Sequence, residues 1–222
     1  MQKGYFEETC EEIGVLWRHD GLSTNHHVSV LINGTYLHYG TFFRTELILE
    51  DPLFLERMVQ ELLRCLLGNG VDVASVDRVV GLKQARTIIH EMARQIGYSN
   101  GRNCFCSYLE EGKNDADVKE LLFIKSPAPR LDETVLVCGD VYLDGSTYLR
   151  MASAVREGGS RVVPCFAVLF NGTEVIQGVT GFDVVAVMSE YLQSWTLQNC
   201  PYCKKGSLPY PTEIKGDWKI LK

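Results

Sequence analysis

The sequence has 222 residues, of which 45% are hydrophobic and 23% are charged. These proportions are typical of a folded protein of one to two domains and exclude a disordered or fibrous chain. With 22 basic against 28 acidic residues the net charge is −6, which disfavours binding to nucleic acid or to an anionic membrane. No apolar run approaches the roughly 18 residues of a membrane span. Eight cysteines are too few for a disulfide scaffold, so we expect a reducing, cytoplasmic location.

The first 50 residues carry scattered aromatic side chains and turn signals, and they predict a small flanking subdomain. Residues 51–68 predict a helix, because Asp51 is a good cap, a proline follows it, and apolar residues then recur on one face. A short β-branched strand at 79–80 and a helix over 83–96 come next.

The middle of the chain alternates strands with loops and helices. The sequence predicts a strand at 104–109, a loop at 110–119, strands at 121–125 and 134–138, a helix at 148–157 and a strand at 161–170. This alternation is typical of an α/β domain with a parallel sheet, over about residues 70–180. The Asn171-Gly172 pair predicts a hairpin turn, and residues 183–195 predict a helix. We therefore divide the chain into three parts. Residues 1–50 are an N-terminal segment, residues 51–182 are an α/β core with its leading helix, and residues 183–222 are a C-terminal helix with a loop-rich tail.

The turn after the strand 134–138 is the first candidate site. Ligands of parallel sheets bind beyond the carboxyl ends of the strands, where this turn is expected to lie. Gly145, Ser146 and Thr147 offer backbone amides, two hydroxyls and the positive end of a helix dipole to a phosphate group. Asp140 is placed to reach sugar hydroxyls or a magnesium ion. The alternative is that Ser146 caps the helix and Asp140 stabilises the turn.

Residues 135–147, Val-Leu-Val-Cys-Gly-Asp-Val-Tyr-Leu-Asp-Gly-Ser-Thr, resemble the phosphoribosyl pyrophosphate loop of the type I phosphoribosyltransferases, with the nearest likeness to the orotate phosphoribosyltransferases. Asp140, Gly145 and Thr147 match the family pattern at the right spacing. Further segments are similar to that family in order and separation, so the likeness spans most of the chain. They are residues 33–52, the charged loop 110–119 at the place of the mobile catalytic loop, and the tail 200–209, Cys-Pro-Tyr-Cys-Lys-Lys-Gly-Ser-Leu-Pro.

The resemblance implies an α/β, type I phosphoribosyltransferase-like parallel sheet flanked by helices, with a small hood subdomain from both termini. It implies transfer of a 5-phosphoribosyl group from phosphoribosyl pyrophosphate to a nitrogenous base, with Mg²⁺, in nucleotide metabolism and as a homodimer. The implied catalytic residues are Asp140 at the ribose and Lys113 or Lys119 approaching the leaving group. The implied substrate-binding residues are Gly139, Asp140, Asp144, Gly145, Ser146 and Thr147, with Ser146 and Thr147 at the 5-phosphate.

Departures from the family pattern favour a second hypothesis, a noncatalytic protein of this fold that binds a nucleotide or a protein partner. Gly139 replaces one of two loop carboxylates, and Asp144 puts a negative charge where a threonine would meet the phosphate. The pyrophosphate loop lacks the family's glycines. Side-chain contacts from Lys83 and Arg86 are one way to compensate, and the simpler interpretation is that both belong to a solvated first helical turn. Residues 110–120 hold five carboxylates against two lysines, and a segment of charge −3 is a poor clamp for pyrophosphate.

Cys200 and Cys203 have the spacing of half a zinc site, but no second Cys-x-x-Cys completes it. His26 and His27 are candidate partners, although adjacent histidines in a loop are usually solvated. We therefore interpret the cysteine pair as part of a structural turn and assign no metal ligands. A zinc-dependent interaction module is the third hypothesis.

Overall fold

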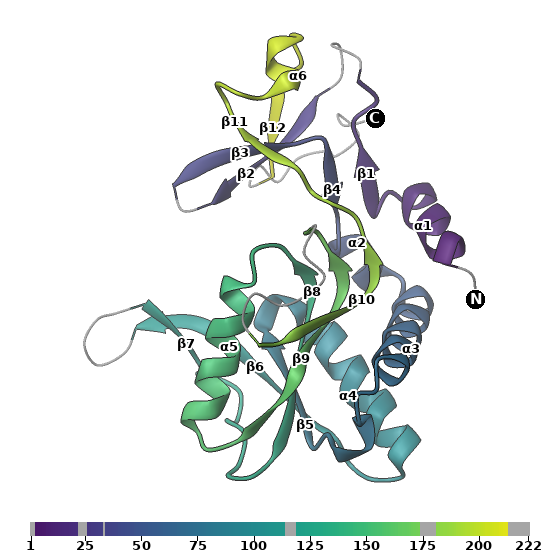
Figure 1. Ribbon diagram of the computed structural model, residues 1–222, viewed down its shortest axis with the longest axis vertical. Coiled ribbons are helices and arrows are strands. Elements are labelled where there is room, and N and C mark those ends of the chain that lie inside the picture. The colour runs from purple at the N-terminus through teal and green to yellow at the C-terminus, as the bar shows by residue number, and fades with distance from the viewer. Residues whose placement is uncertain (1–2, 22–25, 33, 114–118, 174–180, 213–222) are drawn as a thin grey trace. The chain divides into compact units, whose positions relative to one another are not determined.

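The computed structural model describes residues 3–21, 26–32, 34–113, 119–173 and 181–212. The chain forms two compact units (Figure 1). The terminal unit combines Met1–Leu47 with Tyr191–Lys222, and the central unit is Ile48–Glu190. Within the described ranges, no helix is both long and apolar enough to cross a membrane.

The central unit contains a six-stranded sheet with the order β10-β9-β8-β5-β6-β7. Its strands are β5 (Arg78–Leu82), β6 (Phe105–Lys113), β7 (Lys119–Leu122), β8 (Thr134–Tyr142), β9 (Arg161–Asn171) and β10 (Asp183–Ser189). Five of them run parallel, and β7 pairs antiparallel with β6 at one edge. The parallel sheet predicted over residues 70–180 is therefore confirmed.

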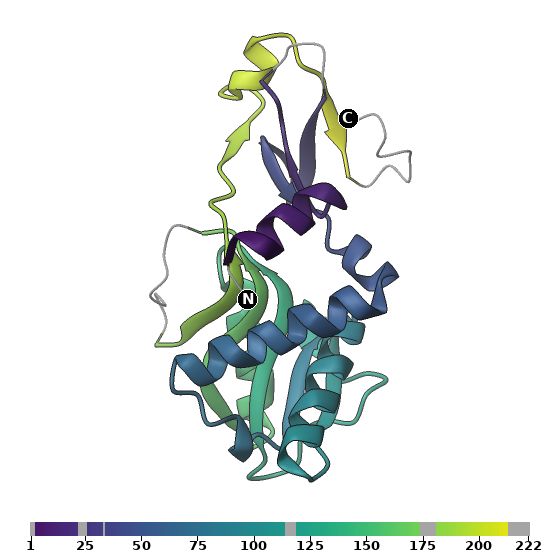
Figure 2. The ribbon, with the colours of Figure 1, turned by 90° about the vertical axis from the view of Figure 1, so that its right-hand side faces the viewer.

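Helices cover both faces of this sheet. On one face lie α3 (Pro52–Gly68) and α4 (Arg86–Asn100), and on the other lies α5 (Ser146–Glu157), as Figures 1 and 2 show. Short 3₁₀ turns occupy Val73–Ser75 and Lys83–Ala85. The Asp51 carboxylate accepts hydrogen bonds from the amides of Leu53 (3.1 Å) and Phe54 (3.0 Å), so α3 begins where the sequence predicts.

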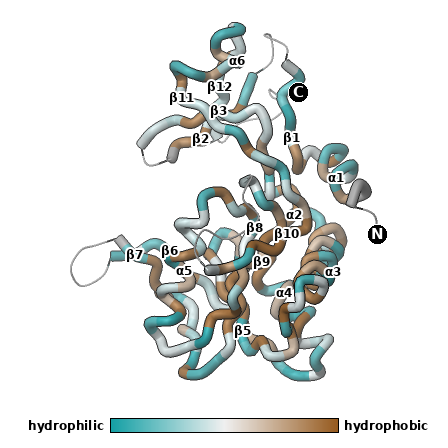
Figure 3. Tube along the Cα trace, viewed as in Figure 1, coloured by the Kyte–Doolittle hydropathy of each residue, from teal (hydrophilic) through white to brown (hydrophobic). Residues whose placement is uncertain are grey.

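A hydrophobic interior lies between the central sheet and α5. Its fully buried side chains include Val80, Val135, Val137, Val155, Phe166 and Val168. Figure 3 shows apolar residues concentrated along β9 and β10 as well. Burying these side chains fixes the order of the strands, and so it fixes the edge at which β8 ends and α5 begins.

The terminal unit is built from both ends of the described chain. Its four-stranded sheet has the order β11-β3-β2-β12. These strands are β2 (His27–Ile32), β3 (Thr35–Tyr39), β11 (Ser194–Thr196) and β12 (Pro209–Pro211). A second, two-stranded sheet pairs β1 (Leu16–Arg18) with β4 (Thr41–Phe43), and the helices are α1 (Lys3–Glu12), α2 (Glu46–Glu50) at the boundary of the units, and α6 (Pro201–Lys204). A subdomain from both termini is what the family resemblance implied.

The helix predicted over residues 183–195 is wrong. The segment forms strand β10 and begins β11. Val184 and Val185 are β-branched and buried, and they pair with Phe166 and Ala167 of β9. Packing against a neighbouring strand outweighed the helix signal of the Asp183 cap.

Two further local predictions need correction. Asn171-Gly172 is not a hairpin turn, because β9 and β10 run parallel and a hairpin joins antiparallel strands. Residues 174–180, which follow this pair, lie outside the described part of the chain. The predicted loop 110–119 is in part a strand, since β6 continues through Lys113 and Glu110 pairs with Leu122 of β7.

Candidate functional site

The turn after β8 places an acidic side chain at the start of α5. Gly145 has a φ of +76°, a left-handed conformation that favours glycine, and the chain turns here into the helix. The Asp144 carboxylate accepts hydrogen bonds from the Ser146 amide (3.0 Å) and from the Ser146 hydroxyl (2.8 Å). The side chain of Ser146 therefore does not cap the helix; Asp144 satisfies one of the amides that a helix start leaves free.

Aromatic side chains fill the space behind this turn. The Tyr148 hydroxyl donates a hydrogen bond to the Val141 carbonyl (3.2 Å), and a Cβ at position 139 would overlap that hydroxyl. The Tyr148 ring lies 5.3 Å from Tyr142 and 5.4 Å from Phe166 between centroids. Burial raises the pKa of the Tyr148 phenol well above its ordinary value, so the group stays neutral. Position 139 is a glycine because Tyr148 occupies the place that a side chain there would need.

A cavity of about 470 Å³ opens beside the turn. It is enclosed by the ends of β5 and β6, by β7 and by the first turns of α5, so it lies at the edge of the sheet where the sequence predicts a ligand. Its lining residues are Leu82, Lys83, Gln84, Leu109, Glu110, Glu111, Leu121, Thr147 and Arg150. The volume is within the range of small-molecule sites.

The charged residues of the cavity are paired with one another. The Lys83 ammonium lies 2.6 Å from a Glu110 carboxylate oxygen, and the Arg150 guanidinium lies 3.9 Å from Glu111. The lining therefore carries two positive and two negative charges. The other oxygen of Glu110 is buried and has no hydrogen-bond partner within the described residues.

Among the predicted site residues whose side chains the structure describes, only one lies in the lining. Thr147 faces the cavity, whereas Asp140 lies half-buried near the end of β8. Gly139 lies within β8, Asp144 and Gly145 form the turn after it, and Ser146 is the first residue of α5. Lys113 is exposed on β6, and the side chain of Lys119 lies outside the described part of the structure. Sequence reasoning missed Arg150 as a cavity residue, although its helical spacing from Thr147, i to i+3, was a usable signal. The sequence also predicted a solvated Lys83; in the structure its ammonium pairs with the carboxylate of Glu110 on β6.

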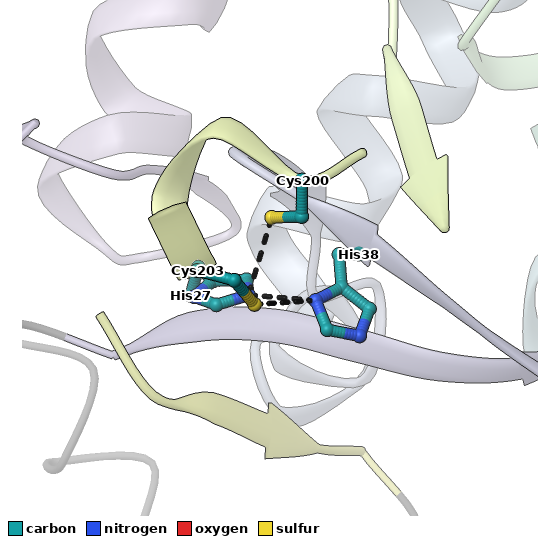
Figure 4. Close-up of side chains that lie close together, drawn as sticks. All are labelled: His27, His38, Cys200 and Cys203. Carbon is teal, nitrogen blue, oxygen red and sulfur yellow. Dashed lines mark hydrogen bonds between the residues drawn. The ribbon is translucent and has the colours of Figure 1, made fainter. Parts of the chain in front are cut away.

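Four metal-ligating side chains converge in the terminal unit (Figure 4). His27 and His38 come from β2 and β3, Cys200 precedes α6, and Cys203 lies within it. Burial lowers the pKa of His27 to about 4, with further lowering from His38 and other histidines, and raises the pKa of the Cys203 thiol to about 11. Both histidines are therefore held as neutral imidazoles, since burial also lowers the pKa of His38.

The fold is that of the type I phosphoribosyltransferases, as the family resemblance implied. A crystal structure of orotate phosphoribosyltransferase from Aeropyrum pernix superposes with a TM-score of 0.58 at 18% identity, covering 82% of this chain and 92% of that one. The orotate phosphoribosyltransferase of Francisella tularensis gives a TM-score of 0.55 at 12% identity, covering 85% and 84% of the two chains.

The sequence resembles one particular group within this class, the orotate phosphoribosyltransferases, and this too was expected. The orotate phosphoribosyltransferase of Pelotomaculum thermopropionicum is 26% identical over 213 residues, which are 96% of this chain and all of that protein. That of Heliobacterium modesticaldum is 27% identical over 170 residues, 77% of this chain and 81% of the relative. No protein-family model matches the chain.

Proposed function

We propose that this chain is a divergent phosphoribosyltransferase of the orotate type, which moves a 5-phosphoribosyl group from phosphoribosyl pyrophosphate to a ring nitrogen of a base. The observation that carries the proposal is the cavity, where Thr147, Lys83 and Arg150 converge at the carboxyl edge of the sheet. A hydroxyl at a helix start and two cations are the groups that bind phosphate oxygens. The full-length similarity to orotate phosphoribosyltransferases supports the same choice.

The reaction breaks the bond between ribose C1 and pyrophosphate, forms a C1–N bond, and releases the proton of the ring nitrogen. Positive charge develops on the ribose and negative charge on the departing pyrophosphate, so cations must face the leaving group. Lys83 and Arg150 are available for this role when substrate phosphates replace Glu110 and Glu111 as their partners. We assign Ser146 and Thr147 to the 5-phosphate, Asp140 to the ribose, and Lys113 or Lys119 to the leaving group.

One carboxylate of the family pattern, that of Asp140, remains as a donor for magnesium. Mg²⁺ binds oxygen ligands, commonly one or two carboxylates together with substrate phosphates, and Asp140 supplies one half-buried carboxylate where Gly139 supplies none. When bound, the ion would neutralise charge on the pyrophosphate. The homodimer implied by the resemblance stays a prediction, which light scattering on the purified protein measures.

A second candidate is a noncatalytic protein that binds a nucleoside monophosphate in the same cavity. Three observations favour it: Asp144 already holds the Ser146 amide, Tyr148 leaves no room for a carboxylate at position 139, and the cations of the cavity are paired. A monophosphate needs fewer positive charges than pyrophosphate.

Calorimetry separates the two candidates. The transferase requires Mg²⁺-dependent binding of phosphoribosyl pyrophosphate and release of pyrophosphate when a base such as orotate is added. Thr147→Val should weaken that binding about tenfold through one lost hydrogen bond to an anion, and Asp140→Ala should also weaken it. Thr87→Val, an exposed threonine on α4 outside the cavity, is the matched control and should change nothing.

Each outcome decides between the candidates. Binding of a pyrimidine nucleoside monophosphate without binding of the pyrophosphate donor establishes the noncatalytic protein. Absence of binding for both ligands at millimolar concentration refutes both candidates. Pyrophosphate release that is equal in wild type and in Thr147→Val removes the cavity from the mechanism.

A further inference from the structure

The cluster in the terminal unit carries an inference that does not depend on the proposed function. The donor atoms of His27, His38, Cys200 and Cys203 all lie within 4.8 Å of one another. Three of the four side chains are buried, and the fourth, Cys203, is half-buried. Imidazole and thiolate ligands in a two-plus-two set are typical of zinc. We propose that these four residues bind one zinc ion as a closed, structural site.

The distances between donors are close to those of a zinc tetrahedron. With Zn–S near 2.3 Å and Zn–N near 2.0–2.1 Å, a tetrahedral site separates sulfur from nitrogen by about 3.6 Å. The His27 Nε2 atom lies 3.6 Å from Cys200 Sγ and 3.5 Å from Cys203 Sγ, and His38 Nδ1 lies 3.3 Å from Cys203 Sγ. The two nitrogens, 2.8 Å apart, need to separate by only about 0.5 Å to reach a tetrahedral edge.

An outer shell orients the first imidazole. His27 Nδ1 lies 2.9 Å from the hydroxyl of Ser207, which is itself 3.3 Å from His19 Nε2. The Gly21 amide donates to His19 Nδ1 (2.9 Å), so His19 carries its proton on Nε2 and donates it to Ser207. A hydrogen bond from His27 Nδ1–H to Ser207 leaves Nε2 as a lone-pair donor directed at the cysteines, as outer-shell partners do at zinc sites.

The backbone presents the ligands from both ends of the described chain. His38 pairs with Ser29 across the β2–β3 ladder, which makes His27 its diagonal neighbour on the same face. Cys200 and Cys203 sit on one helical turn, and the Tyr202 ring between them packs against His19 with centroids 4.5 Å apart. No position on the ion is left for water or substrate when all four groups bind, so the site is structural and not catalytic.

The ion would cross-link the segment that carries Cys200 and Cys203 to the β2–β3 hairpin. That segment otherwise adds β11 and β12 to the sheet, and each has three residues. Because the four ligands come together only in the folded unit, the free energy of zinc binding adds to the stability of that unit. Zinc therefore supplies to the terminal unit the stability that two short edge strands lack.

The test is the metal content of the purified full-length protein. We expect one zinc ion per chain in wild type, and loss of the ion in Cys203→Ser and in His38→Ala. Cys65→Ser, which alters a half-buried cysteine of α3 far in sequence from the cluster, is the matched control and should keep the ion. Ser207→Ala removes the outer-shell partner and should weaken zinc binding about tenfold, in a competition with a chromophoric chelator.

Two readouts keep the proposal falsifiable if a ligand variant fails to fold. In wild type, replacement of zinc by cobalt should give the absorption bands of a tetrahedral cobalt–thiolate site. Chelation should change the fluorescence of Trp17 and Trp195, which lie in the terminal unit. Wild-type protein that binds neither zinc nor cobalt at micromolar concentration overturns the proposal, as does a full complement of zinc in both ligand variants.

Discussion

Replacing Asp144 by asparagine should strengthen binding of a phosphorylated ligand at the turn after β8. The substitution keeps an oxygen that accepts from the Ser146 amide and removes the charge. A carboxylate about 4 Å from a phosphate charge costs about 1 kcal/mol in water and about 4 kcal/mol at an effective dielectric of 20. The Asp144 side chain is exposed, so the lower figure applies, and it corresponds to about a fivefold gain in affinity.

Calorimetry with phosphoribosyl pyrophosphate or a pyrimidine nucleoside monophosphate measures the gain. The matched control is Asp72→Asn, because Asp72 also accepts from an amide two residues on, that of Ala74 at 3.1 Å, and its loss changes the net charge equally. The gain should be largest at low salt and small when the Debye length falls to about 3 Å at 1 M. Unchanged or weaker binding in Asp144→Asn, or an equal gain in the control, refutes the reasoning that places a phosphate at this turn.

Three predictions concern the stability of the central unit, measured by urea unfolding followed by circular dichroism. Glu133→Ala should cost about 3–5 kcal/mol, because it leaves the Arg78 guanidinium, 4% exposed, without its carboxylate partner at 2.7 Å. Arg64→Ala, which removes the exposed ion pair with Glu61, should cost less than about 0.5 kcal/mol. The hydrogen bond from Arg78 is the main cause that lowers the pKa of Glu133 below its ordinary 4.5, so the free energy of unfolding should decrease as the pH falls below that value. Glu133→Ala should make this decrease smaller, and an unchanged decrease contradicts the assignment. Gly139→Ala should cost about 1–3 kcal/mol through overlap with the Tyr148 hydroxyl, and less in a Tyr148→Phe background; equal costs in both backgrounds would show that the overlap is not the cause.

The fold was predictable where a local signal and the packing agree. Asp51 followed by proline and an apolar face specifies α3, and the apolar run at 134–138 specifies the first half of β8, because each pattern suits only one kind of burial. The helix predicted over residues 183–195 was wrong because a capping aspartate favoured a helix, while the valines that follow it are buried beside β9. That preference depends on a neighbouring strand and is invisible in the segment itself.

The two candidate sites also differ in how far the sequence alone could predict their residues. The turn around Gly145 and Thr147 is contiguous in sequence, so its residues could be named in advance. For Cys200 and Cys203 the sequence offered His27 as a candidate partner but not His38, because His38 becomes a neighbour of His27 only through the register of an antiparallel ladder. Strand register is set by packing and turn geometry, and a single sequence does not reveal it.

The pairing of β12 with β2 has a consequence for synthesis of the protein. Tyr210 pairs with Val28, about 180 residues earlier in the chain. At roughly 5–20 residues per second, a ribosome needs about 10–40 s to deliver the second partner after the first. For that interval one side of β2 is an open edge on the nascent chain, the kind of surface that invites association with other strands. Chaperone binding during translation, or a change in elongation rate, would therefore act on the exposed edge of β2.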